Sequence, residues 1–185
     1  MGDCLGGSMN ASLLSVQPQH AQNIFAGAKT VELRRRVPRV KPGHVFFIYE
    51  SAPTMAVRGF AYVDAVAKEP LDALWAGVNK AACVSFEEFS AYFADRADGV
   101  AIRLSATCEF EAPISLREAR ALAPWFHPPQ SWTSFAALPP NLQAALARAF
   151  RLAAATHDIH RSLPAVPMNS TVTPDAADPA PRHPA

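Results

Sequence analysis

Short stretches with the apolar patterning of β-strands recur along this chain and limit the folds open to it. Residues 29–35 alternate Val31 and Leu33 with polar side chains, and residues 44–50 form an almost continuous apolar run. Residues 12–17, 56–67 and 99–110 have a similar character. The segments between these stretches are too short for the long helices of regular β-α-β crossovers. The pattern therefore predicts an α+β fold, a small mixed β-barrel of about five strands with short helices, rather than a doubly wound sheet.

Helical signals are confined to short segments and to one longer segment near the end. Pro18 suits the first turn of a helix and Gly27 its end. Two short helices are expected after the fourth strand, the second of them introduced by a capping box of Ser85 and Glu88. Residues 140–155 are rich in Ala and Leu, with one apolar face, and predict a C-terminal helix.

Composition divides the chain into four parts. We expect a flexible N-terminus over residues 1–9, a folded domain over 10–136 and a C-terminal helix over 137–160. Residues 161–185 are rich in Pro and Ala and almost free of large apolar side chains, which predicts a disordered tail. Whether translation starts at Met1 or at Met9 stays open.

Charge and cysteine content exclude several classes of protein. The chain has 17 Lys and Arg and 16 Asp and Glu, for a net charge of +1. This balance argues against a polybasic protein that binds nucleic acid with its whole surface. No apolar run is long enough for a membrane helix, and no secretory signal is visible, so a cytoplasmic protein is expected. Three widely spaced cysteines form neither a disulfide framework nor a zinc ribbon. The pair His157 and His160 lacks a third ligand, so we expect no metal and no cofactor.

One local cluster of basic residues stands out against this balanced charge. Six cations fall within 13 residues, offset only by Glu32; they are Lys29, Arg34, Arg35, Arg36, Arg39 and Lys41. Guanidinium groups bind phosphate oxygens through paired hydrogen bonds, so the cluster favours contact with phosphate or nucleic acid. A solvated strand edge that carries charges to prevent pairing with other strands is the alternative interpretation.

Several motifs in the same order resemble the ASCH domain of the PUA-like superfamily. The strand-to-helix start Leu14–Pro18 (LSVQP) is followed by Ile24–Arg34 (IFAGAKTVELR). Val40–Gly43 is similar to the V-x-x-G turn of the family, although His44 stands where an acidic residue is usual. Ser51–Pro53 and the P-P-Q-S box at Pro128–Ser131 complete a resemblance that covers roughly residues 13–135. The box is typical of one bacterial and archaeal branch.

The resemblance implies a PUA-like barrel with a cleft beside the first helix, where relatives bind RNA or modified nucleobases. We therefore expect a regulatory protein that binds RNA or a nucleotide-like ligand. Lys29, Arg34, Arg35 and Arg36 would contact phosphates. The other candidate ligand-binding residues are Ser15, Gln17, Glu32, Tyr49, Gln130 and Ser131, with Tyr49 or Trp132 stacking on a base.

Two other functions stay open. Some relatives hydrolyse N4-acetylcytidine with Lys, Thr and Glu, but here Glu32 stands at the position of the threonine. Others resemble ribonucleases, in which Lys29 would stabilise a phosphorane and Glu32 or His20 would move protons. A hydrolase acting on RNA or on a modified nucleoside is therefore the alternative. A third hypothesis is a regulator that binds DNA or a protein partner through the C-terminal helix and the tail.

Overall fold

The computed structural model describes residues 9–36 and 40–156. The expectations for residues 1–8, for Arg39, for the pair His157 and His160 and for the tail therefore lie outside the described residues. The C-terminal helix, expected over 137–160, is observed as α5 (Pro140–Thr156).

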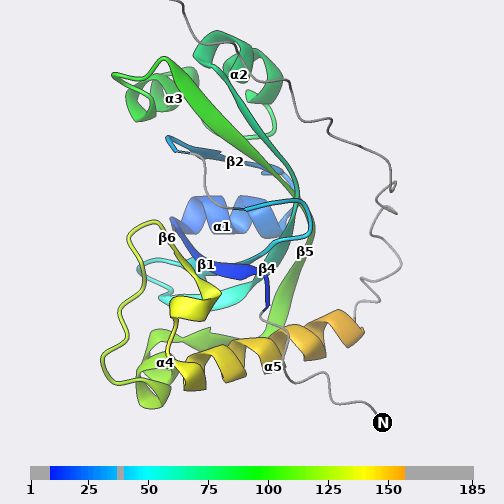
Figure 1. Ribbon diagram of the computed structural model, residues 1–185, viewed down its shortest axis with the longest axis vertical. Coiled ribbons are helices and arrows are strands. Elements are labelled where there is room, and N and C mark those ends of the chain that lie inside the picture. The colour runs from blue at the N-terminus through cyan, green and yellow to red at the C-terminus, as the bar shows by residue number, and fades with distance from the viewer. Residues whose placement is uncertain (1–8, 37–39, 157–185) are drawn as a thin grey trace, which may run out of the picture.

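A single curled sheet of six strands forms the centre of the structure (Figure 1). Its strands are β1 (Ala11–Val16), β2 (Val31–Arg34), β3 (Val45–Glu50), β4 (Ala56–Pro70), β5 (Asp98–Ser115) and β6 (Trp132–Ser134). They follow the order β2-β5-β4-β3-β1-β6. Only β1 and β3 pair in parallel; the other neighbours are antiparallel. The sheet confirms the expected α+β fold with a PUA-like half-barrel, and the short β6 adds one strand to the approximate five.

The long strands β4 and β5 connect two ends of the molecule. They cross the full height of Figure 1, with α2 (Leu71–Val78) and α3 (Phe86–Tyr92) at one end. At the other end lie α4 (Leu116–Leu122) and α5. Helix α1 (Pro18–Phe25) lies between these ends, in the curl of the sheet. This arrangement leaves α1 facing β2 and α3.

Three apolar clusters hold these layers together. One lies between the sheet and α4 and α5, where Phe47, Leu142 and Leu146 are fully buried. A second lies under α1 around Ile24 and Phe46, and a third joins β2 to α2 and α3. Leu142 and Leu146 are completely buried, so the sheet already covers this face of the C-terminal helix. The hypothesis that the helix binds a partner stays a prediction.

Local sequence signals explain where several elements begin. Ser85 and Glu88 form the expected capping box of α3: each side chain accepts a hydrogen bond from the backbone N–H of the other. Gly59 lies where β4 approaches β5 so closely that a side chain would overlap the carbonyl oxygen of Cys108. Within the described ranges, no helix has the length and apolar character needed to span a membrane.

Candidate functional site

A pocket of about 370 Å³ opens between α1, β2 and α3. We call it the polar pocket. It is lined by Ser15, Val16, Gln17, His20, Lys29, Glu32, Leu33, Arg34, Val84, Glu88, Phe89, Tyr92 and Gln130. Six of the ten residues proposed from the sequence therefore lie around one cavity. The start of the first helix and the basic strand, separate in the chain, form opposite walls.

The junction of β1 and α1 supplies one wall of the polar pocket. Pro18 begins α1 and Gln17 is its N-cap, but the Gln17 side chain makes no capping hydrogen bond and is exposed. His20 lies in the first turn of the helix, half-buried. The helix start therefore presents an amide side chain and an imidazole to the cavity.

Strand β2 supplies the charged wall through its expected alternation. Val31 and Leu33 pack in the cluster with α2 and α3, while Glu32 and Arg34 lie on the polar side. The Glu32 carboxylate lies 2.8 Å from a terminal nitrogen of Arg34 and 3.6 Å from Nζ of Lys29. Lys29 is only 3% exposed and donates a hydrogen bond of 2.6 Å to the carbonyl oxygen of Ala82. Two cations thus share one carboxylate, which leaves this wall with a net positive charge, while Glu88 of α3 places a second carboxylate in the lining of the pocket.

Three buried polar atoms of this pocket have no hydrogen-bond partner in the described structure. They are Oγ of Ser15, Nδ1 of His20 and Nε of Arg34. These are the only buried side-chain nitrogen or oxygen atoms without a partner among residues 9–36 and 40–156. Buried polar groups are almost always hydrogen-bonded, so their concentration in one cavity indicates a place for a polar ligand or ordered water.

The environment of His20 favours its neutral form. Burial lowers the pKa of the imidazole, and the positive charge of Lys29 lowers it further, while Glu32 partly opposes this effect. At neutral pH the ring is therefore uncharged and one of its nitrogens can accept a proton. Burial also raises the pKa of the Tyr92 hydroxyl on the opposite wall, so this group stays protonated.

The remaining basic residues surround a second, adjoining cavity of about 380 Å³, which we call the arginine pocket. It is lined by Arg34, Arg35, Arg36, Tyr92, Arg96, Ser131 and Trp132. Arg34 donates a hydrogen bond of 2.7 Å to Oγ of Ser131. Arg34 and Tyr92 line both pockets, so Ser131 and the arginines lie next to the polar pocket.

One of the ten proposed residues lies elsewhere. Tyr49 is 5% exposed and packs in the cluster beneath α4 and α5, on the other face of the sheet. It therefore offers no exposed ring for stacking, whereas Trp132, half-buried, borders the arginine pocket. Strand β3 is buried on both faces, so its sequence pattern does not show which side a given residue takes.

Sequence reasoning missed the contribution of α3 to the site. Glu88 and Tyr92 line the polar pocket, and Arg96 follows the helix into the arginine pocket. The capping box predicted the helix, but no local signal places it against β2. Within the described ranges, no group of three or more His, Cys, Asp or Glu side chains could hold a metal ion.

Comparison with known proteins places this architecture in a family. No family model matches the chain. Over 122 residues it is 32% identical to an ASCH domain-containing ribonuclease of Zymomonas mobilis, covering 66% of this chain and 82% of that protein. The crystal structure of ASCH from Zymomonas mobilis matches with a TM-score of 0.68 at 29% identity, covering 76% of this chain and 95% of that one. A serine-to-alanine variant of it matches with a TM-score of 0.69 at 28% identity, covering 76% and 96%.

The chain therefore belongs to the ASCH domain family. The similarity spans most of the relative and most of the described fold of this protein. The narrower assignment to a branch from the box at Pro128–Ser131 stays a prediction.

Proposed function

We propose that this protein binds single-stranded RNA and cleaves it in the polar pocket. The observation that carries the proposal is the placement of a buried lysine and a half-buried arginine, Lys29 and Arg34, across one cavity from the uncharged imidazole of His20, whose Nδ1 has no hydrogen-bond partner in the described structure. The Zymomonas mobilis relative, 32% identical, is described as a ribonuclease, which supports the same chemistry. This combination favours the hydrolase alternative over a module that only binds RNA.

The charged wall is suited to a phosphodiester group. Lys29 and Arg34 carry two positive charges, and Glu32 neutralises one of them. Glu32 is held by both cations, so it positions them rather than taking a proton. The Nε of Arg34 is a further donor of this wall that has no partner in the described structure. Charge that develops on phosphorus oxygens in the transition state would be stabilised by these fixed donors.

His20 would act as the general base. In the proposed step, the ribose 2′-hydroxyl gives its proton to the imidazole as its oxygen bonds to phosphorus. The bond from phosphorus to the 5′ oxygen breaks, and that oxygen takes the proton back from the imidazolium. The products are a 2′,3′-cyclic phosphate and a 5′-hydroxyl, with atoms and charge balanced. A lowered pKa keeps His20 in the form that accepts the proton.

A cleavage and binding assay with a labelled single-stranded RNA tests this proposal. We expect His20→Asn to abolish cleavage while RNA binding persists. His127→Asn is a matched control, because His127 is exposed, lies outside the polar pocket and should leave cleavage unchanged. The rate of the wild-type protein should rise with pH through a midpoint below the ordinary histidine range and then level off.

Two results would contradict the proposal. RNA that is bound by the wild-type protein but left intact would make this a recognition module. Cleavage that survives replacement of the 2′-hydroxyls by hydrogen would exclude the attack described here.

A further inference from the structure

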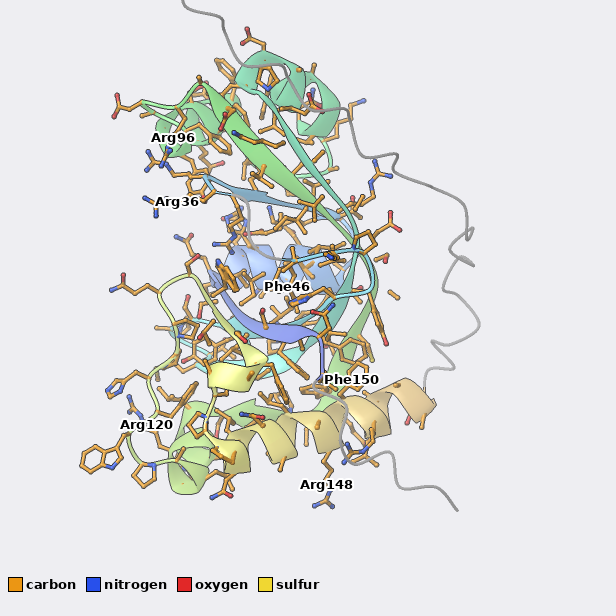
Figure 2. All side chains as sticks on the ribbon, in the orientation of Figure 1. Arg36, Phe46, Arg96, Arg120, Arg148 and Phe150 are labelled. Carbon is orange, nitrogen blue, oxygen red and sulfur yellow. The ribbon has the colours of Figure 1, made fainter. Side chains whose placement is uncertain are left out.

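The arginine pocket has the composition of an anion-binding site. Of the seven residues that line it, four are arginines and none is acidic. The arginines come from two elements far apart in the chain: Arg34, Arg35 and Arg36 from the end of β2, and Arg96 from the turn before β5. Figure 2 shows Arg36 and Arg96 projecting from the same side of the molecule, between the end that carries α3 and the level of α1.

A specific contact brings these two elements together. Arg35 donates a hydrogen bond of 3.0 Å to the carbonyl oxygen of Ala94. Ala94 lies two residues before Arg96, whose own backbone N–H bonds the carbonyl oxygen of Phe93. The end of β2 is therefore fixed against the turn that carries Arg96, so like charges converge because the backbone holds them there.

The charge of this pocket is almost uncompensated. Arg34 is paired with Glu32, but Arg35, Arg36 and Arg96 form no ion pair with any described residue. Like charges held close together destabilise a fold, and each guanidinium still offers donors with the fork geometry that matches phosphate. A bound phosphate group would supply the missing counter-charge.

The two pockets form adjoining parts of one surface. Arg34 and Tyr92 line both, and the volumes of about 370 and 380 Å³ are similar. Tyr92 is exposed and Trp132 half-buried, so the arginine pocket has two aromatic rings beside its cations. Cations that track a backbone, beside aromatic rings on which bases stack, are typical of sites for single-stranded nucleic acid.

We infer that the arginine pocket binds the phosphodiester group next to the one held in the polar pocket, with the adjoining base against Trp132 or Tyr92. This inference rests on the proposed function. The substrates are then single-stranded oligonucleotides that span both pockets. A mononucleotide can fill only one of the two pockets. Arg96 then contacts only strands that are long enough to reach the arginine pocket, and so it determines the preference for longer strands.

Binding measurements on two ligands test the inference. The first is a 2′-O-methylated oligouridylate about six nucleotides long, which this chemistry cannot cleave. The second is uridine 5′-monophosphate, which is too short to reach both pockets. We expect Arg96→Ala to weaken oligouridylate binding about tenfold, with the affinity for the monophosphate unchanged. The slope of the logarithm of the oligouridylate binding constant against the logarithm of the salt concentration should become shallower by about one. Arg36→Ala should behave in the same way.

Arg148→Ala is the matched control, because Arg148 is exposed on α5 at the opposite end of the molecule (Figure 2). Its affinity for both ligands should equal that of the wild-type protein. Oligouridylate binding that is equally strong in Arg96→Ala, Arg36→Ala and Arg148→Ala would overturn the inference and leave the proposed function intact. An equal loss for the monophosphate would also overturn it. If the wild-type protein binds neither oligouridylate nor RNA, the proposed function fails as well.

Discussion

Replacing Glu32 with glutamine tests whether this carboxylate stabilises the two cations of the charged wall, Lys29 and Arg34. The carboxylate side chain is 10% exposed, and its oxygens lie 2.8 Å from Arg34 and 3.6 Å from Lys29. At an effective dielectric constant of about 20, these contacts correspond to about 6 and about 5 kcal/mol of Coulomb energy. The neutral amide recovers several kcal/mol of carboxylate desolvation. We therefore expect Glu32→Gln to lower the free energy of unfolding by about 3–4 kcal/mol, because the buried Lys29 and the half-buried Arg34 lose their shared counter-ion.

Urea unfolding followed by tryptophan fluorescence measures this loss. Glu111→Gln, at an exposed carboxylate outside both pockets, serves as the control and should leave the free energy of unfolding essentially unchanged. Inorganic phosphate should restore part of the stability of Glu32→Gln, because an anion that binds only the folded state stabilises it. A loss below about 1 kcal/mol, the range of exposed ion pairs, would refute the reasoning. A loss that phosphate does not reduce would refute the link between the carboxylate and an anion site.

Two further predictions concern the fold. Burial lowers the pKa of His44, whose ring contacts Asn10 and Ser12, so the unfolded state binds the proton more readily than the folded state. The free energy of unfolding should therefore fall as the pH drops below about 6.5. In His44→Gln, the urea midpoint should lose most of this pH dependence. Gly59→Ala should lower the free energy of unfolding by about 3 kcal/mol or more, because its Cβ would overlap β5. Gly77→Ala, where nothing lies within 4 Å, should instead stabilise α2 by about 0.5–1 kcal/mol. Equal midpoints for the two glycine variants would contradict the packing argument.

The elements that the sequence predicts best are those with strong local signals. The alternation around Val31 and Leu33 predicted both β2 and the faces of its side chains. The capping box at Ser85 and Glu88 correctly marked the start of α3. These signals depend on contacts within a few residues, which a single sequence contains.

Two elements were missed, and only one of them depends on distant contacts. Strand β6 has only three residues and exists because it pairs with β1, more than 100 residues earlier. Helix α4 has a local signal, since Ser115 and Glu118 form a second capping box, but it is not among the helices predicted from the sequence. Six of the ten proposed site residues share the polar pocket, and the family motif contributed most of them.

The position of Arg34 explains why stability and ligand binding should be coupled in this protein. Its guanidinium bonds Glu32 on one side and Ser131 on the other, while Nε has no partner. It also lines both pockets, so a phosphate in either one meets the same group. An anion would therefore add a partner to a network that already joins β2 to the segment before β6. Because that network contains more positive than negative charge, binding of an anion should stabilise it and thereby raise the free energy of unfolding.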